Sequence, residues 1–241
     1  MGVCMTLLKG SAQSLLVDTG YGTADVSAFA ASLTDTPLKV ILTHGHHDHM
    51  LGARWFPEVM MFPEDLPDFH TYSAPDIRRR IMDSALAKGL PLPEDYLTCP
   101  IPQPQPLVEE DIDLGGLTAQ IIHCPGHTPG SAVVWVKEHQ LLLTGDDWNP
   151  CTWLFFPAAL PVAAYRENVR RLLALPIRHV LCSHQPHLYD RFMLEDFLQA
   201  LTDDVLDAAQ PVNVGYPQDT RKALLPHRQE LVFDWNKFRK E

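Results

Sequence analysis

The stretch 41–53, "ILTHGHHDHMLGA", places four histidines and one aspartate in the six positions from His44 to His49. They follow a short apolar run, 38–42, which predicts a buried strand, and precede residues that predict a helix. Packing gives no reason to gather imidazoles and a carboxylate at a strand-to-helix turn. Neutral imidazole and carboxylate are, however, good ligands for a divalent cation. The stretch therefore predicts a metal site.

Four other apolar runs also end in a residue that could bind or support a metal. "SLLVD" ends at Asp18, "IIHCPGH" at His127, "LLLTGD" at Asp146 and "HVLCSH" at His184. In layered α/β folds, the loops that leave strand ends build the active site. We therefore expect these four residues to lie near the histidine cluster. The other histidines are interpreted as structural or surface residues: His47, His70, His123, His139, His179, His187 and His227.

Length and charge narrow the classes of protein and partner. The chain has 241 residues, 46% of them hydrophobic, which is enough for a sizeable core and fits one domain over 1–241. A formal net charge of -11 argues against a nucleic-acid partner and favours a small-molecule substrate. Five dispersed cysteines without a C-x-x-C pattern, no membrane-length apolar run and no secretory-type start indicate a cytoplasmic setting.

The N-terminal half is expected to begin with a hairpin around "KGSAQ", followed by a helix near 23–33 that Thr23 caps. From Phe56 to Glu110 the chain is rich in proline, and we interpret this stretch as an insertion on a common core. It contains one predicted helix, "SAPDIRRRIMDSALAKG", with a capping box of Ser73 and Asp76 and a stop at Gly89.

The second half alternates between predicted strands and helices. The expected elements are strands in "LTAQIIHC", "SAVVWV", "QLLLTGDD" and "IRHVLCSH", helices near 161–175 and across 190–209, and a last strand within 229–237.

"THGHHDH", taken with "VDTGYG", "PGHTPGS", "TGDD" and "SHQPH", resembles the metallo-β-lactamase-fold hydrolase superfamily over about residues 3 to 187. The resemblance implies an α/β fold: a four-layer αββα sandwich with a metal site at one edge between the two sheets, and here an insertion at about 56–110. The ligand set looks closest to that of glyoxalase II, whose basic glutathione-binding residues have no match in the C-terminal part. The segment "ELVFDWN" is expected to fill the sheet edge where relatives have a strand before the first hairpin.

The resemblance also implies a role for each residue of the site. His44, His46 and His127 would hold one metal, Asp48, His49 and His184 a second, and Asp146 would bridge both. Asp18 would orient the ligands, and with Asp48 it belongs to the catalytic group. Seven ligands are too many for one tetrahedral ion, so two divalent ions are expected: Zn²⁺, with Fe or Mn as alternatives.

The function implied is that of a dinuclear hydrolase using a metal-bound hydroxide on a carboxyl ester, thioester or lactone. Two alternatives are a phosphodiesterase of the same fold and an iron-dependent oxidoreductase similar to persulfide dioxygenases. The flavodiiron branch, which has Glu at the position of His46, and the β-lactamases with Cys at the position of Asp146 fit less well.

The residues after Asp146, "DWNPCTWLFFPAAL", are the part of the sequence that indicates the kind of substrate. Five apolar residues are expected close to the metals, as an apolar wall for an acyl or aromatic group: Trp148, Trp153, Leu154, Phe155 and Phe156. Trp148, Trp153 and Phe155 are the candidate substrate residues, in a loop without regular structure before about Leu160. The alternative is a loop that packs into the core.

Overall fold

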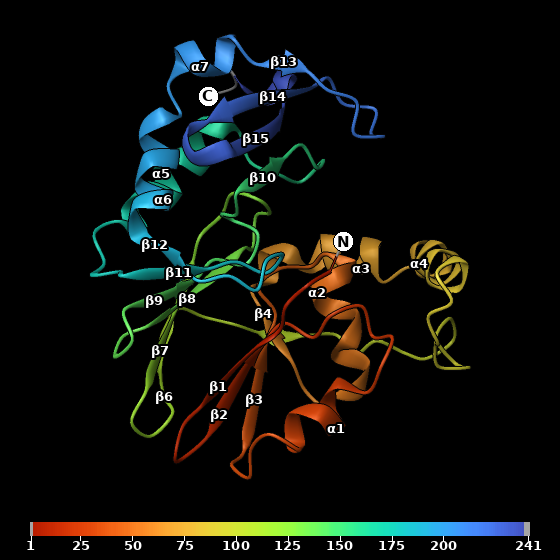
Figure 1. Ribbon diagram of the computed structural model, residues 1–241. Helices are drawn as coiled ribbons and strands as arrows, with labels where there is room; N and C mark the ends of the chain where they lie inside the picture. Colours follow the sequence, from red (N-terminus) through yellow and green to blue (C-terminus); the bar gives the residue numbers. More distant parts are fainter. Residues whose placement is uncertain (1, 239–241) are drawn as a thin grey trace.

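The computed structural model describes residues 2–238, in which two sheets face each other across a buried core (Figure 1). The first sheet has the order β1-β2-β3-β4-β5. Its opening pair, β1 and β2, is the expected antiparallel hairpin, and the remaining strands pair in parallel. The strands are β1 (Thr6–Lys9), β2 (Ser14–Val17), β3 (Leu38–Ile41), β4 (Met60–Met61) and β5 (Gln105–Pro106).

The second sheet has the order β12-β11-β9-β8-β7-β6. Its neighbours are antiparallel except β9 and β11, which run in parallel. The parallel pair carries the ends of β9 and β11 to the same edge. The strands are β6 (Glu110–Asp113), β7 (Thr118–His123), β8 (Ala132–Val136), β9 (Leu141–Leu143), β11 (His179–Leu181) and β12 (Tyr189–Asp190).

Alternation along single strands assigns the layers, because successive side chains of a strand point to opposite faces. Leu15 and Val17 of β2 pack into the core between the sheets, whereas Leu16 packs toward the helices outside the first sheet. On β8, Val134 faces the same central core and Val133 faces the helices outside the second sheet. The predicted four-layer αββα sandwich is therefore confirmed.

Helices cover the outer faces of both sheets (Figure 1). In the part of the chain from 2 to 238, no helix is both long and apolar enough to cross a membrane. The N-terminal helices are α1 (Val26–Ala31), α2 (His47–Met50), η1 (Leu51–Trp55), η2 (Pro63–Asp65), α3 (Leu66–Tyr72) and α4 (Pro75–Ala87). The C-terminal helices are α5 (Val162–Leu172), α6 (Arg191–Ala200), α7 (Asp203–Asp207), η3 (Pro226–Arg228) and α8 (Trp235–Phe238).

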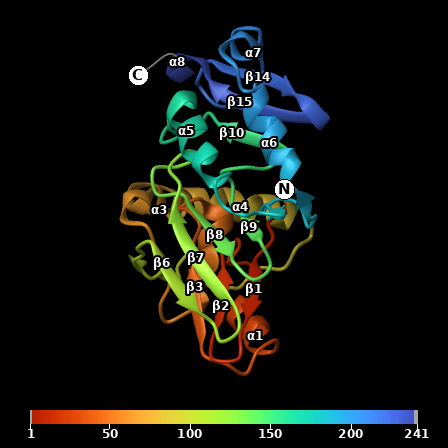
Figure 2. The same cartoon turned by 90° about the vertical axis from the view of Figure 1, so that its left-hand side faces the viewer.

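A third sheet lies beyond α5 and α6, and Figure 2 shows it at the end of the molecule away from the first sheet. Its strands are β10 (Cys151–Leu154), β13 (Gln210–Pro211), β14 (Thr220–Leu225) and β15 (Gln229–Asp234). Two expectations are wrong here. The strand β15 pairs with β10 and β14 and does not fill an edge of the first sheet. The segment after Asp146 contains the regular strand β10, which backbone pairing to β15 stabilises despite the nearby prolines.

Residues 56–110 are only partly an insertion, although their proline-rich sequence suggested one, since β4 and β5 complete the first sheet. It also contains α3, which sequence patterning missed because the helix has only seven residues. Only the connection between β4 and β5, at about 62–104, is added to the core.

Three predictions of helix ends and extents are corrected. Asp25, not Thr23, caps α1, because its carboxylate accepts from the backbone N–H of Ser27 and Ala28. The capping box in α4 does not form: Ala74 is the cap residue. Gly89 does follow α4 with a positive φ of 67°, as expected for a stop. The helix across 190–209 is two helices, α6 and α7, separated at Leu201 and Thr202.

Asp65 joins the two halves of the sandwich beneath the histidine cluster. Its carboxylate accepts from the N–H of Gly45 at 2.8 Å, the N–H of Gly130 at 2.5 Å and the hydroxyl of Thr128 at 2.7 Å. A Cβ on Gly130 would lie 2.8 Å from Asp65 Oδ1, so the close approach requires glycine. Burial raises the pKa of Asp65 to about 6, although the hydrogen bonds from Thr128, Gly45 and Gly130 oppose this rise. One buried carboxylate thus links the loop after β3 to the loop after β7.

We predict that Asp65→Asn lowers the free energy of unfolding by about 2–4 kcal/mol, because the amide keeps one acceptor oxygen and turns an NH₂ group toward a buried N–H donor. Urea denaturation of the two proteins measures the difference. Glu64→Gln, at the exposed neighbouring position, is the control and should change stability little. A loss below about 1 kcal/mol in Asp65→Asn, the level of an ordinary neutral hydrogen bond, would contradict the linking role.

Candidate metal centre

The loops that leave five strands meet at one edge of the sandwich, where the sequence predicted a site. Asp18 follows β2, His44 follows β3, His127 follows β7, Asp146 follows β9 and His184 follows β11. All seven residues expected to bind metal fall into three groups whose ligand atoms lie within 4.8 Å of one another. The groups are His44, His46 and His127; His44, His49 and Asp146; and Asp48, His49 and His184.

The first group is buried between the two sheets. His127 Nε2 lies 3.0 Å from His46 Nδ1, so these two nitrogens face each other. The ring of His44 meets the rings of His46 and His127 edge-on at 4.6 and 4.8 Å. Three imidazoles from two loops thus surround one point, as the expected first metal position requires.

Asp48, His49 and His184 lie beside the first group, and the group of His44, His49 and Asp146 connects the two. Asp146 Oδ2 lies 3.0 Å from His184 Nε2 and 3.7 Å from His127 Nε2, while its Oδ1 lies 3.6 Å from His49 Nε2. Asp48 Oδ2 lies 3.7 Å from His184 Nε2 and 3.9 Å from His49 Nε2. Asp146 therefore reaches residues of both groups, which is the arrangement that a bridging ligand needs.

Hydrogen bonds outside the centre orient the imidazole rings. Asp18 Oδ2 accepts from His49 Nδ1 at 2.8 Å, and the carboxylate of Asp18 is itself held by the N–H and hydroxyl of Thr43. The carbonyl of Trp153 accepts from His127 Nδ1 at 2.7 Å, and that of Gly2 accepts from His184 Nδ1 at 2.9 Å. Each bond occupies Nδ1 and leaves Nε2 for the centre, as outer partners of metal-binding histidines do.

His46 has the opposite orientation. Its Nδ1 points toward His127, and its Nε2 lies 3.8 Å from a carboxylate oxygen of Asp68 on α3. Burial raises the pKa of the Asp68 carboxyl. The sequence analysis did not select Asp68, because it lies within a short helix and not at the end of an apolar run.

The protonation states favour a cation. Burial and the neighbouring His49 lower the pKa of His44 well below its usual range, and burial and His127 do the same for His46. Burial alone would raise the pKa of Asp146, but His49 and His184 lower it well below its usual range. Burial would likewise lower the pKa of His49, which Asp18 and Asp146 instead raise. Neutral imidazoles and ionised carboxylates are the forms that bind metal, so His44, His46 and Asp146 are ready for an ion, whereas His49 has to release a proton when one binds.

The atoms that face the centre fit metal ions. His44 Nε2, His49 Nε2 and Asp146 Oδ1 are buried without a hydrogen-bond partner among the described residues. Buried polar atoms are rarely left unsatisfied, because each costs about 1–3 kcal/mol. The donors are imidazole nitrogens and carboxylate oxygens, which suit Zn²⁺, Fe or Mn. Their arrangement therefore accommodates divalent ions.

The three expected substrate residues differ in their access to the centre. Trp148 is 0% exposed and packs edge-on against Tyr189 and Phe197, so the expectation that it lines a pocket is corrected. Phe155 is 1% exposed and also belongs to the core. Trp148 precedes β10 and Phe155 follows it, and both pack into the core where an open, irregular loop was expected. Trp153 is half-buried, and its carbonyl supports His127.

Phe156 and Tyr72 contact the histidines directly. Both rings lie 4.6 Å from the ring of His46, and Phe156 lies 5.4 Å from His127. The sequence placed Phe156 close to the metals, although it was not among the three candidate substrate residues, whereas Tyr72 was not predicted. No pattern indicated Tyr72, because its position depends on α3.

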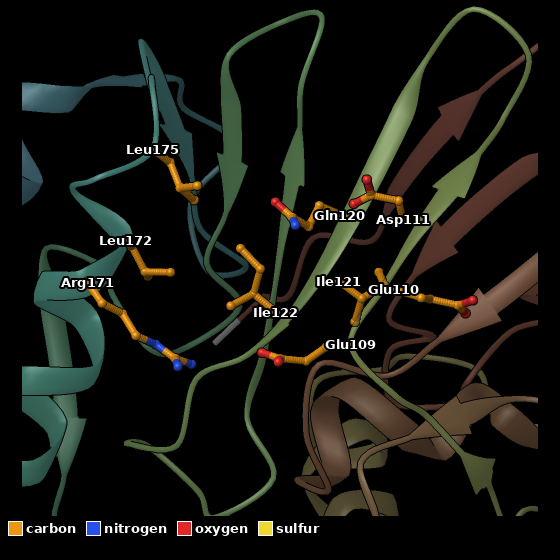
Figure 3. Close-up of a pocket in the computed structure, with 9 residues that line it drawn as sticks. All are labelled: Glu109, Glu110, Asp111, Gln120, Ile121, Ile122, Arg171, Leu172 and Leu175. Carbon is orange, nitrogen blue, oxygen red and sulfur yellow. The ribbon is translucent and has the colours of Figure 1, made fainter.

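A separate surface pocket of about 490 Å³ lies between β6, β7 and α5 (Figure 3). It contains none of the metal-centre residues. Its acidic side chains already have partners: Glu110 pairs with Lys39, Asp111 with Lys137, and Glu109 accepts from the N–H of His123. This pocket is therefore not the candidate site.

Comparison with known proteins identifies relatives over part or most of the chain. An uncharacterized protein of Mycobacterium leprae is 34% identical over 117 residues, which are 46% of this chain and about half (50%) of that protein. The acyl-coenzyme A thioesterase MBLAC2 of Gallus gallus is 26% identical over 206 residues, 78% of this chain and 73% of that protein. A hydroxyacylglutathione hydrolase of Xylella fastidiosa is 27% identical over 183 residues, 75% of this chain and 58% of that protein.

Solved structures share the fold. A metallo-beta-lactamase family protein from Thermus thermophilus is similar with a TM-score of 0.59 and 23% identity, over 82% of this chain and 73% of that one. The protein TTHA1623, solved in a di-iron-bound form, gives a TM-score of 0.56 and 27% identity, over 80% of this chain and 91% of that one.

A sequence model of the metallo-beta-lactamase superfamily matches residues 2–184, which include every residue of the three ligand groups and Asp18. The resemblance seen in the motifs is confirmed. This chain belongs to the metallo-beta-lactamase superfamily.

Proposed function

We propose that this protein is a hydrolase that depends on two divalent metal ions and cleaves carboxyl esters, thioesters or lactones, with thioesters as the first class to test. One observation carries the proposal: seven imidazole and carboxylate side chains converge in two adjacent groups, and Asp146 reaches both. Such a set exceeds what one tetrahedral ion can use.

Each side chain has a defined part in this proposal. His44, His46 and His127 hold one ion, Asp48, His49 and His184 hold the other, and Asp146 bridges them. When bound, the two ions lower the pKa of water and polarise the carbonyl of the scissile group. Asp18 fixes the ring of His49 through Nδ1, and the carbonyl of Trp153 fixes that of His127. These bonds keep the ligands in position before substrate arrives, so catalysis does not require the site to reorganise.

The relatives support thioester chemistry. Two are named as an acyl-coenzyme A thioesterase and as a hydroxyacylglutathione hydrolase, and coenzyme A and glutathione are both thiols. A small-molecule substrate remains part of the proposal, because a net charge of -11 disfavours a phosphate-rich macromolecule.

The identity of the metals separates this proposal from the oxidoreductase alternative. Zinc is the ion we propose, and the ligand set also accepts iron or manganese. The di-iron form of TTHA1623 favours iron as the second candidate. An iron-loaded protein that consumes oxygen with persulfides, and does not hydrolyse thioesters, would support the oxidoreductase.

We predict that the purified protein, supplied with zinc, holds two ions per chain. Elemental analysis for zinc, iron and manganese measures the stoichiometry, and dialysis against a chelator should remove both the metals and thioester hydrolysis. One ion or fewer per chain after metal supplementation would contradict the dinuclear site.

We predict that Asp146→Ala abolishes hydrolysis and lowers metal affinity by at least the 10–100-fold typical of a lost ligand or supporting residue. The reason is that the bridge between the two groups is lost. Competition with a chromophoric chelator measures affinity. Asp113→Ala, which removes an exposed carboxylate on β6, is the matched control and should retain both metals. Wild-type metal content and activity in Asp146→Ala would show that the site is assigned wrongly.

We predict a milder effect for Asp18→Asn. The amide can still accept one hydrogen bond but no longer carries the charge that orients His49, so metal affinity should fall about tenfold while the protein retains measurable hydrolysis. The same chelator assay and kcat measured at saturating zinc test this. Complete loss of folding or of metal would instead give Asp18 a larger role than orientation.

A further inference from the structure

We propose that Tyr72, Phe156 and Tyr216 form the acyl-binding wall of the metal centre and select thioesters with a neutral, extended or aromatic acyl group. This inference rests on the proposed function and assigns its substrate class to residues that no sequence motif marks. Tyr216 comes from the third sheet, outside the residues 2–184 that match the family.

The wall begins at the first ligand group. The ring of His46 lies between the rings of Tyr72 and Phe156, each 4.6 Å from it. Phe156 also faces His127 at 5.4 Å. A carbonyl group bound next to these histidines would therefore have aromatic rings on this flank, and its acyl arm would extend along them.

Tyr216 continues the same surface away from the metals. Its ring lies 5.5 Å from Phe156 and 5.3 Å from Phe155. It belongs to the connection between β13 and β14, which Figure 1 shows projecting on the side of the molecule where α3 and α4 lie. Burial raises the pKa of the Tyr72 phenol, and the nearby Tyr216 adds to this rise. Tyr72 therefore lies near Tyr216, and both border the route to Phe156 and His46.

Exposure distinguishes this wall from the core beneath it. Tyr216 is 42% exposed and Tyr72 is half-buried, whereas Phe156 is 8% and Phe155 1% exposed. The open surface of the wall is therefore that of the two tyrosines, and Phe156 forms its buried base next to His46. A large ring held in place by two aromatic contacts and left open beside a metal centre offers apolar area that a substrate can cover. Phe155 supports the wall from behind and does not face the substrate.

The charges near the wall favour a neutral acyl group. Asp68 lies one helical turn before Tyr72 on α3, with a carboxylate oxygen 3.8 Å from a ring nitrogen of His46, and Asp48 belongs to the metal centre itself. Lys237 donates to the carbonyls of Phe156, Pro157 and Ala159, so it holds the loop that carries Phe156. Arg80 acts on Tyr216 at the outer end of the wall, so a short acyl group whose carboxylate stays beside His46 would meet the acidic side chains and not this cation.

The experiment compares S-acyl N-acetylcysteamine thioesters, which share a small neutral thiol, using the zinc-loaded full-length protein. The acyl groups are acetyl, octanoyl, phenylacetyl and glutaryl. We expect kcat/KM to be at least tenfold higher for octanoyl and phenylacetyl than for acetyl or glutaryl. Tyr216→Ala should lower kcat/KM for the octanoyl thioester at least tenfold and for the acetyl thioester less than threefold. Tyr216→Phe should restore the preference, because the ring and not the hydroxyl provides the surface.

Phe192→Ala is the control, because Phe192 is a similarly exposed aromatic residue, on α6 beside His227. It should leave the acyl preference unchanged. Hydrolysis without a chain-length preference, or a preference that Tyr216→Ala leaves intact, would overturn the wall and leave the proposed hydrolase standing.

Binding of octanoate, measured by calorimetry against acetate, tests the wall independently of turnover. Octanoate should bind the wild-type protein at least tenfold more tightly than acetate, and Tyr216→Ala should remove most of that difference. If no thioester is hydrolysed but this binding pattern holds, the proposed function fails and the acyl site remains. If octanoate and acetate bind equally, the wall is refuted.

Discussion

Three carboxylates buried in contact with imidazoles impose the constraint on which the rest of this structure depends. Asp18 and Asp146 are buried, Asp48 is nearly so, and no lysine or arginine of the described residues is paired with any of them. Charges in such a place are costly unless a cation compensates them. The centre is thus built for an ion that the polypeptide itself does not provide, and the surrounding fold must hold the negative groups together until that ion binds.

Both sheets help to hold the buried carboxylates and histidines in place. Asp65 links the loop of His44 and His46 to the loop of His127, and Asp18 links the end of β2 to His49. These supports are carboxylates that accept hydrogen bonds from backbone or ring N–H groups, so they are satisfied without metal. Three atoms that face the centre, His44 Nε2, His49 Nε2 and Asp146 Oδ1, have in contrast no hydrogen-bond partner among the described residues. The presence or absence of hydrogen-bond partners therefore distinguishes the residues that position the ligands from the ligands themselves.

The strand ends predicted that Asp18, His127, Asp146 and His184 lie near the histidine cluster, because loops that leave neighbouring strands share one edge. The four-layer fold was implied by the resemblance to the metallo-β-lactamase superfamily. Prediction from the sequence failed where a position depends on tertiary contacts. Trp148 is predicted as a pocket residue, but contacts with Tyr189 and Phe197, which are distant in sequence, hold it in the core. Asp65 follows the apolar run "VMMF" in the same manner as the recognised sites, yet the prolines around it concealed the signal. Tyr216 is distant in sequence from every motif, and only the third sheet brings it near the metals.

The carbonyl of Trp153, which fixes His127, belongs to a strand whose backbone pairs with β15 near the C-terminal end. The third sheet therefore supports a candidate metal ligand through β10 and, in the acyl wall that we propose, supplies Tyr216. This part of the chain therefore cannot be replaced on its own to change substrate specificity. Evolution or design that replaces it to accept another substrate must also rebuild the support of a metal ligand, which couples changes in substrate preference to changes in metal retention.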